Sequence, residues 1–287
     1  MLRFKRPDIP LGFPQDVLQA QTEIAQKIGE LIANPPPVAT GRKKVKSLDF
    51  PDKWKAYKVH FAQAQHGKCG YCEMIVIGGQ PGDVEHYAPK GDVRELDESA
   101  PGREVPFLSS VEGRKTKVLS QVGYWWLAYE WSNYLLACAI CNQSWKGAIF
   151  PVLEQPRSLP PSPASQERPL LLNPFGEIDP GEHLRFSDLG QIEARDQSLY
   201  GKATIRTCGL DRDSLVKARR EKSRRAYQLA QELSQAVKSQ NQAEIKRVLA
   251  DFHEMGRAEY AHAGMVRIIF EENCGISWSD LEELVGE

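Results

Sequence analysis

The stretch HGKCGYCEMIVIGGQPGDVEHYAPKG, residues 66–91, contains a C-x-x-C pair, a glycine-rich bend, and a glutamate directly before a histidine. The pair is Cys69 and Cys72, and a second C-x-x-C pair, Cys138 and Cys141, follows after 65 intervening residues. Tetrahedral zinc takes four thiolates at about 2.3 Å, and two such turns supply them. We therefore predict a structural zinc site that holds a sizeable segment between its two halves.

A redox-active dithiol is the alternative interpretation of CGYC. In that class the first thiol follows a strand and lies at a helix N-terminus, which lowers its pKa. Here the pair follows a helical pattern, and no βαβ unit surrounds it. Cys208 and Cys274 have no neighbouring cysteine and are predicted to be small buried apolar residues.

Composition sets limits on the partners. The 287-residue chain is long enough to bury its own core. It carries 37 basic and 38 acidic residues, so a nucleic acid would have to meet a local basic patch. No apolar run approaches the roughly 20 residues that span a bilayer, and MLRFKRPDIP lacks the apolar stretch of a signal peptide. We expect a cytoplasmic protein without a membrane partner, in which paired cysteines serve metal binding.

The spacing of apolar residues predicts two helices before the first cysteine pair, at residues 14–32 and 52–67. The segment 92–120 is polar and irregular, and is predicted to be a mobile insertion. The aromatic run GYWWLAYEWSN, residues 123–133, predicts a short helix packed inward.

The second half of the chain begins with a proline-rich linker at 153–168, where neither a helix nor a strand ladder can form. Short apolar runs alternate with Gly, Pro and Asp turns over 170–195, a pattern typical of a hairpin or loop layer. From about residue 211 the pattern is helical, and a last helix is expected at about 257–272.

The acid-histidine pair gains meaning from the segment that follows the second cysteine pair, CNQSWKG. Phosphodiester hydrolysis needs a base for water, a divalent ion, and a cation near the scissile phosphate. His86 is the candidate base, Glu85 with Asn142 the candidate metal ligands, and Lys146 or Lys90 the candidate cation. The alternative is a lone histidine that is exposed or capped.

The segments CGYC, DVEHYAPK and YWWLAYEWSNYLLACAICNQSWKGAIFP together resemble the HNH, or ββα-metal, endonuclease family in its form with a four-cysteine zinc site. LLNPFGEIDPGEHLRF and GKATIRTCGLDRDSLVKARR resemble the C-terminal part of bacterial HNH proteins found beside ATPases in anti-phage systems of the Septu and retron type. The likeness covers roughly residues 50–225.

The resemblance implies roles for individual residues. His86 matches the general base, and Asn133 matches the middle asparagine, which orients the loop that carries the histidine. Glu85 and Asn142 match ligands of a catalytic Mg²⁺ or Mn²⁺. Lys146 matches a lysine placed near a phosphate.

Two features depart from the family pattern. Glu85 stands where the better-known members have aspartate, so Asp83 is a substitute ligand. The 46 residues between His86 and Asn133 exceed the gap of compact HNH motifs, and the insertion at 92–120 accounts for the excess.

Residues 212–225, RDSLVKARREKSRR, carry seven Lys or Arg against two acids. Such a helix would attract a phosphate backbone, and the alternative is a solvated helix face. The candidate nucleic-acid contacts are Lys90, Arg219, Arg220, Arg224 and Arg225. His183 is predicted to pack or cap. No G-x-x-x-x-G-K-[ST] stretch occurs, so an associated ATPase would be another protein.

These observations predict a mostly helical α+β protein around a zinc-braced ββα-metal core. The first strand is expected at 73–78 (EMIVIG), the second on the approach to His86, and the helix near the second cysteine pair. The predicted regions are 1–45, an N-terminal helix and basic arm; 46–152, the HNH core; 153–168, the linker; and 169–287, a hairpin layer and helices. The expected function is metal-dependent cleavage of DNA or RNA in anti-phage defence. The alternative is a nucleic-acid-binding scaffold with an inactive core.

Overall fold

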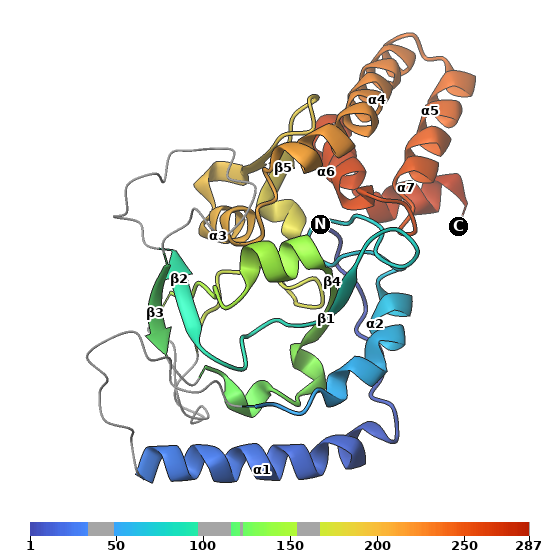
Figure 1. Ribbon diagram of the computed structural model, residues 1–287. Helices are drawn as coiled ribbons and strands as arrows, with labels where there is room; N and C mark the ends of the chain where they lie inside the picture. Colours follow the sequence, from blue (N-terminus) through green and yellow to red (C-terminus); the bar gives the residue numbers. More distant parts are fainter. Residues whose placement is uncertain (34–48, 97–115, 121–122, 154–166, 287) are drawn as a thin grey trace.

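In the computed structural model, two strands from distant parts of the chain pair at the centre of the molecule (Figure 1). Strand β1 (Gly82–His86) runs antiparallel to β4 (Tyr134–Cys138), with Gly82 opposite Cys138 and His86 opposite Tyr134. Every residue of β4 is buried. The continuous apolar run YLLAC is typical of a strand that is covered on both faces.

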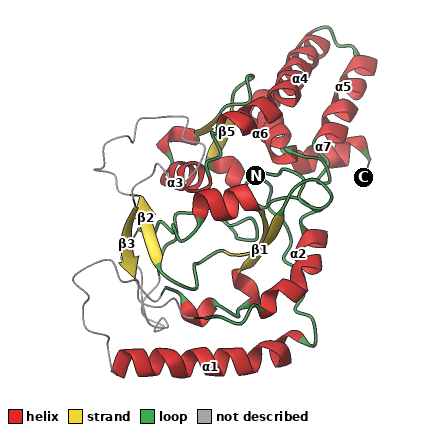
Figure 2. Ribbon diagram, viewed as in Figure 1, coloured by secondary structure: helices red, strands yellow, loops and turns green. Residues whose placement is uncertain are grey.

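The structure describes residues 1–33, 49–96, 116–120, 123–153 and 167–286. Within these ranges the protein is a mostly helical α+β molecule with three two-stranded antiparallel sheets (Figure 2), which confirms the predicted fold class. The predicted basic arm, the tip of the insertion and most of the proline-rich linker lie outside the described residues.

The strand predicted at 73–78 is wrong. In this segment Ile75 forms an isolated bridge with Lys68, and the described residues show no regular strand there. The backbone turns instead around the first cysteine pair: Glu73 N donates to Cys69 O at 2.9 Å, and Glu73 has a φ of +60°. These turn hydrogen bonds take up backbone groups that a strand would need for its ladder.

The expected helix near the second cysteine pair is present as η5 (Ile140–Lys146), a π-helix that begins two residues after β4 ends. Gly147 N donates to Asn142 O at 2.7 Å, five residues back, and Gly147 ends the helix with a φ of +47°. A π-helix turn is wider than an α-helix turn and is frequently found at functional sites. Strand β1 and helix η5 therefore lie where a strand and a helix were predicted, whereas β4 takes the place of the strand predicted at 73–78.

Helix α1 (Phe13–Ala33) forms as predicted and lies along one edge of the molecule (Figure 1). Its buried face is apolar: Phe13, Val17, Ala20, Ile24 and Ile28. The helix predicted at 52–67 is divided into a 3-10 turn, η1 (Lys53–Tyr57), and α2 (Lys58–Ala64). Tyr57, with φ −99° and ψ 10°, departs from α-helical geometry at the junction.

The aromatic run folds as two 3-10 turns, η3 (Trp125–Leu127) and η4 (Trp131–Asn133), rather than as one helix. The insertion at 92–120 is not irregular throughout, because β2 (Val93–Leu96) pairs with β3 (Thr116–Ser120) at its ends.

The predicted hairpin layer consists of η6 (Pro180–Glu182), β5 (Leu184–Phe186), β6 (Ile192–Ala194) and η7 (Arg195–Gln197). Five helices follow: α3 (Leu199–Cys208), α4 (Asp213–Lys238), α5 (Gln242–Met255), α6 (Ala263–Cys274) and α7 (Trp278–Val285). The sequence did not predict α3 or α7. The expected helix at 257–272 starts later, at Ala263, because His262 has a left-handed φ of +59°.

Candidate active site and metal centre

The four paired cysteines meet in one buried cluster. The sulfurs of Cys69, Cys72, Cys138 and Cys141 all lie within 4.8 Å of one another. Cys72 Sγ and Cys138 Sγ are 3.8 Å apart, and a tetrahedron with metal–sulfur bonds of about 2.3 Å has an edge of about 3.8 Å. The donor set and its spacing therefore fit a zinc ion.

The fold builds this cluster from both sides of the strand pair. Cys138 ends β4, Cys141 lies on η5, and the turn that carries Cys69 is tied to β4 through Gly70 N, which donates to Leu136 O at 2.9 Å. Hydrogen bonds from the other three thiols hold the pKa of Cys138 well below its ordinary value. The cluster thus favours at least one thiolate, the form that binds metal.

Arg212 is a contact of the cluster that sequence reasoning did not identify. Both terminal nitrogens of its guanidinium donate to Cys141 Sγ, each at 3.6 Å. One of them also donates to Cys208 O at 3.1 Å and to Gly209 O at 2.9 Å. Burial lowers the pKa of Arg212, but the neighbouring thiols outweigh it, so that the pKa is raised. Arg212 therefore joins the start of α4 to the cysteine cluster as a buried cation.

His86 ends β1 and is 5% exposed. Its Nε2 lies 2.9 Å from Ala128 O, and because a carbonyl can only accept, Nε2 carries the proton. The edge-on rings of Trp54 and Tyr134 lie 4.5 Å and 5.1 Å from the imidazole centroid. Within the described part of the chain, no protein group bonds Nδ1, which is left as the acceptor nitrogen.

The charges around His86 favour its neutral form. Burial lowers the pKa of His86 well below the ordinary value, and the positive charge of Lys90 acts in the same direction. Burial also lowers the pKa of Lys90, which Glu85 and Asp83 partly offset. A neutral imidazole with a free Nδ1 can accept a proton from water.

Asn133 holds the loop that follows His86. Its Oδ1 accepts from Ala88 N at 2.7 Å, and its Nδ2 donates to Ala88 O and Leu127 O, both at 3.0 Å. Its main-chain oxygen accepts from Tyr87 N at 2.8 Å. This is the geometry that a loop-orienting role requires, and the role itself stays a prediction.

Lys146 does not lie where the resemblance placed it. Its side chain is fully buried, and Nζ donates to Glu85 Oε1 at 2.6 Å and to His86 O at 2.9 Å. The ammonium therefore faces the interior and not a surface that a substrate phosphate could reach, and a phosphate contact of Lys146 stays an unsupported prediction. Lys90, half-buried with Nζ 4.4 Å from the Trp54 ring centroid, is the better-placed cation.

The other two predicted metal ligands are half-buried. Asp83 lies two residues before Glu85 on β1, so both side chains project from the same face of the strand. Asn142 lies on η5, and its side chain makes no hydrogen bond within the described residues. The convergence of Asn142 and His86 on one ion stays a prediction.

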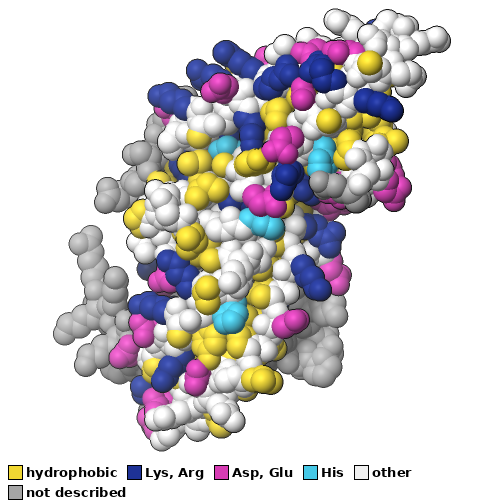
Figure 3. Space-filling view, turned by 90° about the vertical axis from the view of Figure 1, so that its right-hand side faces the viewer, with side chains coloured by type: hydrophobic (Ala, Val, Ile, Leu, Met, Phe, Trp, Pro, Cys, Tyr) yellow, Lys and Arg dark blue, Asp and Glu magenta, His cyan; other side chains and the backbone are white. Residues whose placement is uncertain are grey.

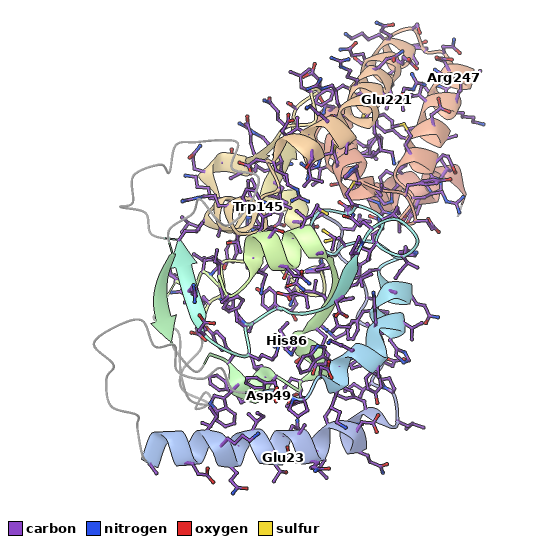
Figure 4. All side chains as sticks on the ribbon, viewed as in Figure 1. Glu23, Asp49, His86, Trp145, Glu221 and Arg247 are labelled. Atoms are coloured by element: carbon purple, nitrogen blue, oxygen red, sulfur yellow. The ribbon has the colours of Figure 1, made fainter. Side chains whose placement is uncertain are left out.

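In Figure 4, His86 lies on the side of the central strands that faces Asp49 and α1. Trp145, which belongs to η5, lies beside α3.

The predicted basic surface on α4 is smaller than its sequence suggests. Arg219 is 3% exposed and donates to Leu210 O at 2.7 Å, so its assignment as a nucleic-acid contact is wrong. Arg225 is paired with Glu232 and Asp251, at 3.0 and 3.1 Å.

Arg220 and Arg224 remain exposed on α4 and form no ion pair within the described residues. Together with Lys217, Glu221, Arg225 and Gln228 they line a shallow surface pocket. Figure 3 shows Lys and Arg interspersed with Asp and Glu at the upper end of the molecule. Binding of nucleic acid by Arg220 and Arg224 stays a prediction.

His183 and Cys208, which were predicted to pack and not to react, lie in packed surroundings. His183 Nδ1 lies 2.9 Å from Ser198 Oγ, and its ring packs against Tyr200 at 5.0 Å. Cys208 is fully buried, whereas Cys274 is only half-buried. Burial raises the pKa of Cys69 well above its ordinary value. A hydrogen bond with Cys138 raises the pKa of Cys72, but those with Cys141 and Cys69 outweigh it and lower this pKa to about 7.

None of the helices in the described part of the chain has the length and apolar character needed to cross a membrane.

Comparison with known proteins gives a partial match. Over 155 residues, 54% of this chain, the sequence is 37% identical to the Septu protein PtuB of Bacillus mycoides (strain KBAB4). The matched region spans 46% of that relative, so it covers about half of the length of the relative. No family model matches the chain. No solved structure matches it either.

Proposed function

We propose that this protein is a metal-dependent endonuclease of the HNH type that hydrolyses phosphodiester bonds in nucleic acid. The observation that carries the proposal is His86: a buried imidazole at the end of β1, with Nε2 bonded to Ala128 O and with no group of the described residues bonded to Nδ1. The proposal is supported by two antiparallel strands, β1 and β4, that are followed by the helix η5, because the resemblance implied two strands and one helix.

His86 Nδ1 is the site that takes the proton from the attacking water. The hydrogen bond to Ala128 O fixes the tautomer, and Asn133 fixes the loop immediately after the histidine. Tyr134 Oη also donates to Ala128 O, at 2.6 Å, so this carbonyl is held in place from two sides. A base that is fixed in this way loses little freedom on reaching the transition state.

The donor chemistry for a catalytic ion is present in Glu85, Asp83 and Asn142, whose carboxylate and carboxamide oxygens are the ligands that Mg²⁺ and Mn²⁺ prefer. A bound divalent ion would neutralise charge that develops on the scissile phosphate. Lys90 is the side chain of this chain that would meet the substrate backbone, because it is half-buried beside Trp54.

We further propose a role in anti-phage defence, which rests on the similarity to a Septu protein. The resemblance to proteins found beside ATPases makes a separate ATPase a candidate partner, and such an ATPase would be another protein because this sequence contains no P-loop.

A second candidate function is a zinc-braced nucleic-acid-binding or scaffold protein whose HNH core is inactive. The ion pair between Lys146 and Glu85 favours it, because the ammonium engages a carboxylate that a catalytic ion would need.

Purified protein incubated with plasmid, single-stranded DNA and tRNA tests the two functions, with Mg²⁺ or Mn²⁺ and then with EDTA. Endonuclease function predicts cleavage that EDTA stops and that His86→Ala abolishes. His183→Ala, a histidine in the hairpin layer, is the matched control and should cleave normally. Full activity of His86→Ala would refute the base assignment. Absence of cleavage, with and without a partner ATPase, would favour the scaffold.

A further inference from the structure

The Glu85–Lys146 ion pair is the most deeply buried charge pair close to the proposed base. The two side chains are 9% and 0% exposed, and Nζ lies 2.6 Å from Oε1. The same Nζ donates to the main-chain oxygen of His86 at 2.9 Å. One ammonium therefore contacts both residues of the acid-histidine pair.

The elements around the pair explain why the lysine is held there. Lys146 is the last residue of η5, and the helix ends at Gly147 immediately afterwards. Ile149 N donates to Lys146 O at 2.7 Å, which fixes the backbone on the other side. The side chain is thus directed inward from a short helix whose two ends are anchored, by Cys141 near its start and by this turn at its end.

The opposite charges of Glu85 and Lys146 determine how their ion pair affects the binding of a metal ion. A fully buried ammonium is strongly disfavoured unless a carboxylate pairs with it, and the same holds for a buried carboxylate. The ion pair with Lys146 thus provides Glu85 with a counter-ion inside the protein. Any divalent ion that takes Glu85 as a ligand must share the carboxylate with a positive charge 2.6 Å away, or displace that charge.

We infer that Lys146 is a positioning residue that holds Glu85 as its internal counter-ion and competes with the divalent cation for that carboxylate. Lys146 thereby lowers the affinity of the site for the ion and directs the Glu85 side chain toward η5. This inference rests on the proposed function, since it takes Glu85 as a ligand of the catalytic ion.

Binding of Mn²⁺, measured by titration calorimetry on the intact zinc-loaded protein, tests the inference without any cleavage assay. Lys146→Met removes the charge with little change in length, and should bind Mn²⁺ at least about tenfold more tightly than wild type. Lys146→Arg keeps a cation beside Glu85 and should bind Mn²⁺ no more tightly than wild type. Lys90→Met, the comparison variant, removes a nearby cation that acts on Glu85 without a hydrogen bond to it, and should raise the Mn²⁺ affinity less than Lys146→Met does.

Thermal unfolding provides the second measurement, because Lys146→Met leaves Glu85 buried without a partner. The zinc-loaded variant should melt below wild type in buffer without added divalent ion, and gain more from added Mn²⁺ than wild type does. Lys146→Met combined with Glu85→Gln should recover the melting temperature without added divalent ion and lose the extra gain from Mn²⁺.

Equal or weaker Mn²⁺ binding by Lys146→Met would overturn the inference, as would absence of Mn²⁺ binding to both proteins. Its failure differs from failure of the proposed function: a wild type that cleaves nucleic acid while Lys146→Met gains no affinity refutes the inference alone. Tighter Mn²⁺ binding without cleavage of any substrate refutes the nuclease and leaves the inference in place.

Discussion

Replacing Arg212 should loosen the cysteine cluster that it contacts. Two guanidinium nitrogens lie 3.6 Å from Cys141 Sγ. At an effective dielectric constant of about 20, unit charges at that distance attract by about 5 kcal/mol. Desolvation of the 7% exposed arginine cancels much of this attraction. A group that hydrogen-bonds a metal ligand typically contributes about 10- to 100-fold to metal affinity, and we expect a loss of this size for Arg212→Met.

The assay is transfer of zinc from the protein to a coloured chelator in excess. Arg212→Met should release zinc about 10- to 100-fold faster than wild type, and Arg212→Lys, which keeps the charge but loses the two-nitrogen contact, should fall between them. Arg219→Met is the matched control. Arg219 is also a buried arginine of this region, but it donates to Leu210 O and stacks on Phe186 instead of contacting a sulfur.

Arg219→Met should therefore lower the melting temperature without a comparable change in zinc release. Release at the wild-type rate from Arg212→Met would refute the reasoning. Equal acceleration by the two substitutions would also refute it, because general destabilisation would then explain the loss of zinc.

Three further predictions concern other parts of the same core. Cys141→Ser should lower the zinc content and unfold the core. Cys208→Ser, which replaces a fully buried cysteine outside the cluster, should keep its zinc. Equal zinc content in the two variants would contradict zinc binding by the cluster. Asn133→Ala should reduce cleavage at least about tenfold while the zinc content stays unchanged, because the main chain of Ala88 loses its two hydrogen bonds to the Asn133 side chain. Unchanged activity would contradict a positioning role for Asn133. Burial lowers the pKa of His262 to about 4, below the value of about 6.5 in the unfolded chain, so that stability falls as the pH drops from about 6.5 toward about 4. Between pH 7 and pH 5 wild type should lose about 2 kcal/mol of unfolding free energy, measured in urea, that His262→Asn retains, and parallel pH profiles would contradict this.

The four paired cysteines could be placed from the sequence because their chemistry depends on spacing and local turns. Two C-x-x-C pairs bring four sulfurs together wherever the two turns meet, and the structure brings them within 4.8 Å. Helix α1 could also be predicted from the sequence, because its apolar residues recur at helical spacing and Pro14 lies near its start.

The strand that pairs with β1 could not be predicted from the sequence. EMIVIG has the composition of a strand, but Glu73 N bonds Cys69 O, and the turn around the metal site takes precedence. The true partner, YLLAC, lies at the end of an aromatic run with no alternation of polar and apolar residues. A strand that is buried on both faces carries no period of two, so its pairing follows from tertiary packing alone.

The charged residues were the least predictable. Lys146, Arg212 and Arg219 belong to residue types that are rarely buried, and sequence reasoning placed Lys146 and Arg219 at the surface. Their burial depends on partners distant in sequence: Glu85 for Lys146 and Cys141 for Arg212. Arg219 is buried against the main chain of Leu210. No local pattern records such contacts, because each depends on how η5 and α4 pack against the strand pair.

The cysteine cluster links these buried charges to both halves of the molecule. Cys141 lies on η5 together with Lys146, which contacts Glu85 and His86, while Arg212 ties the same cysteine to the start of α4. A metal ion that holds Cys141 would therefore fix the helix that aims Lys146 and, through Arg212, the C-terminal helices. Loss of zinc should consequently loosen the candidate active site and the start of α4 together, because Lys146 joins η5 to Glu85 and His86, and Arg212 joins Cys141 of η5 to α4.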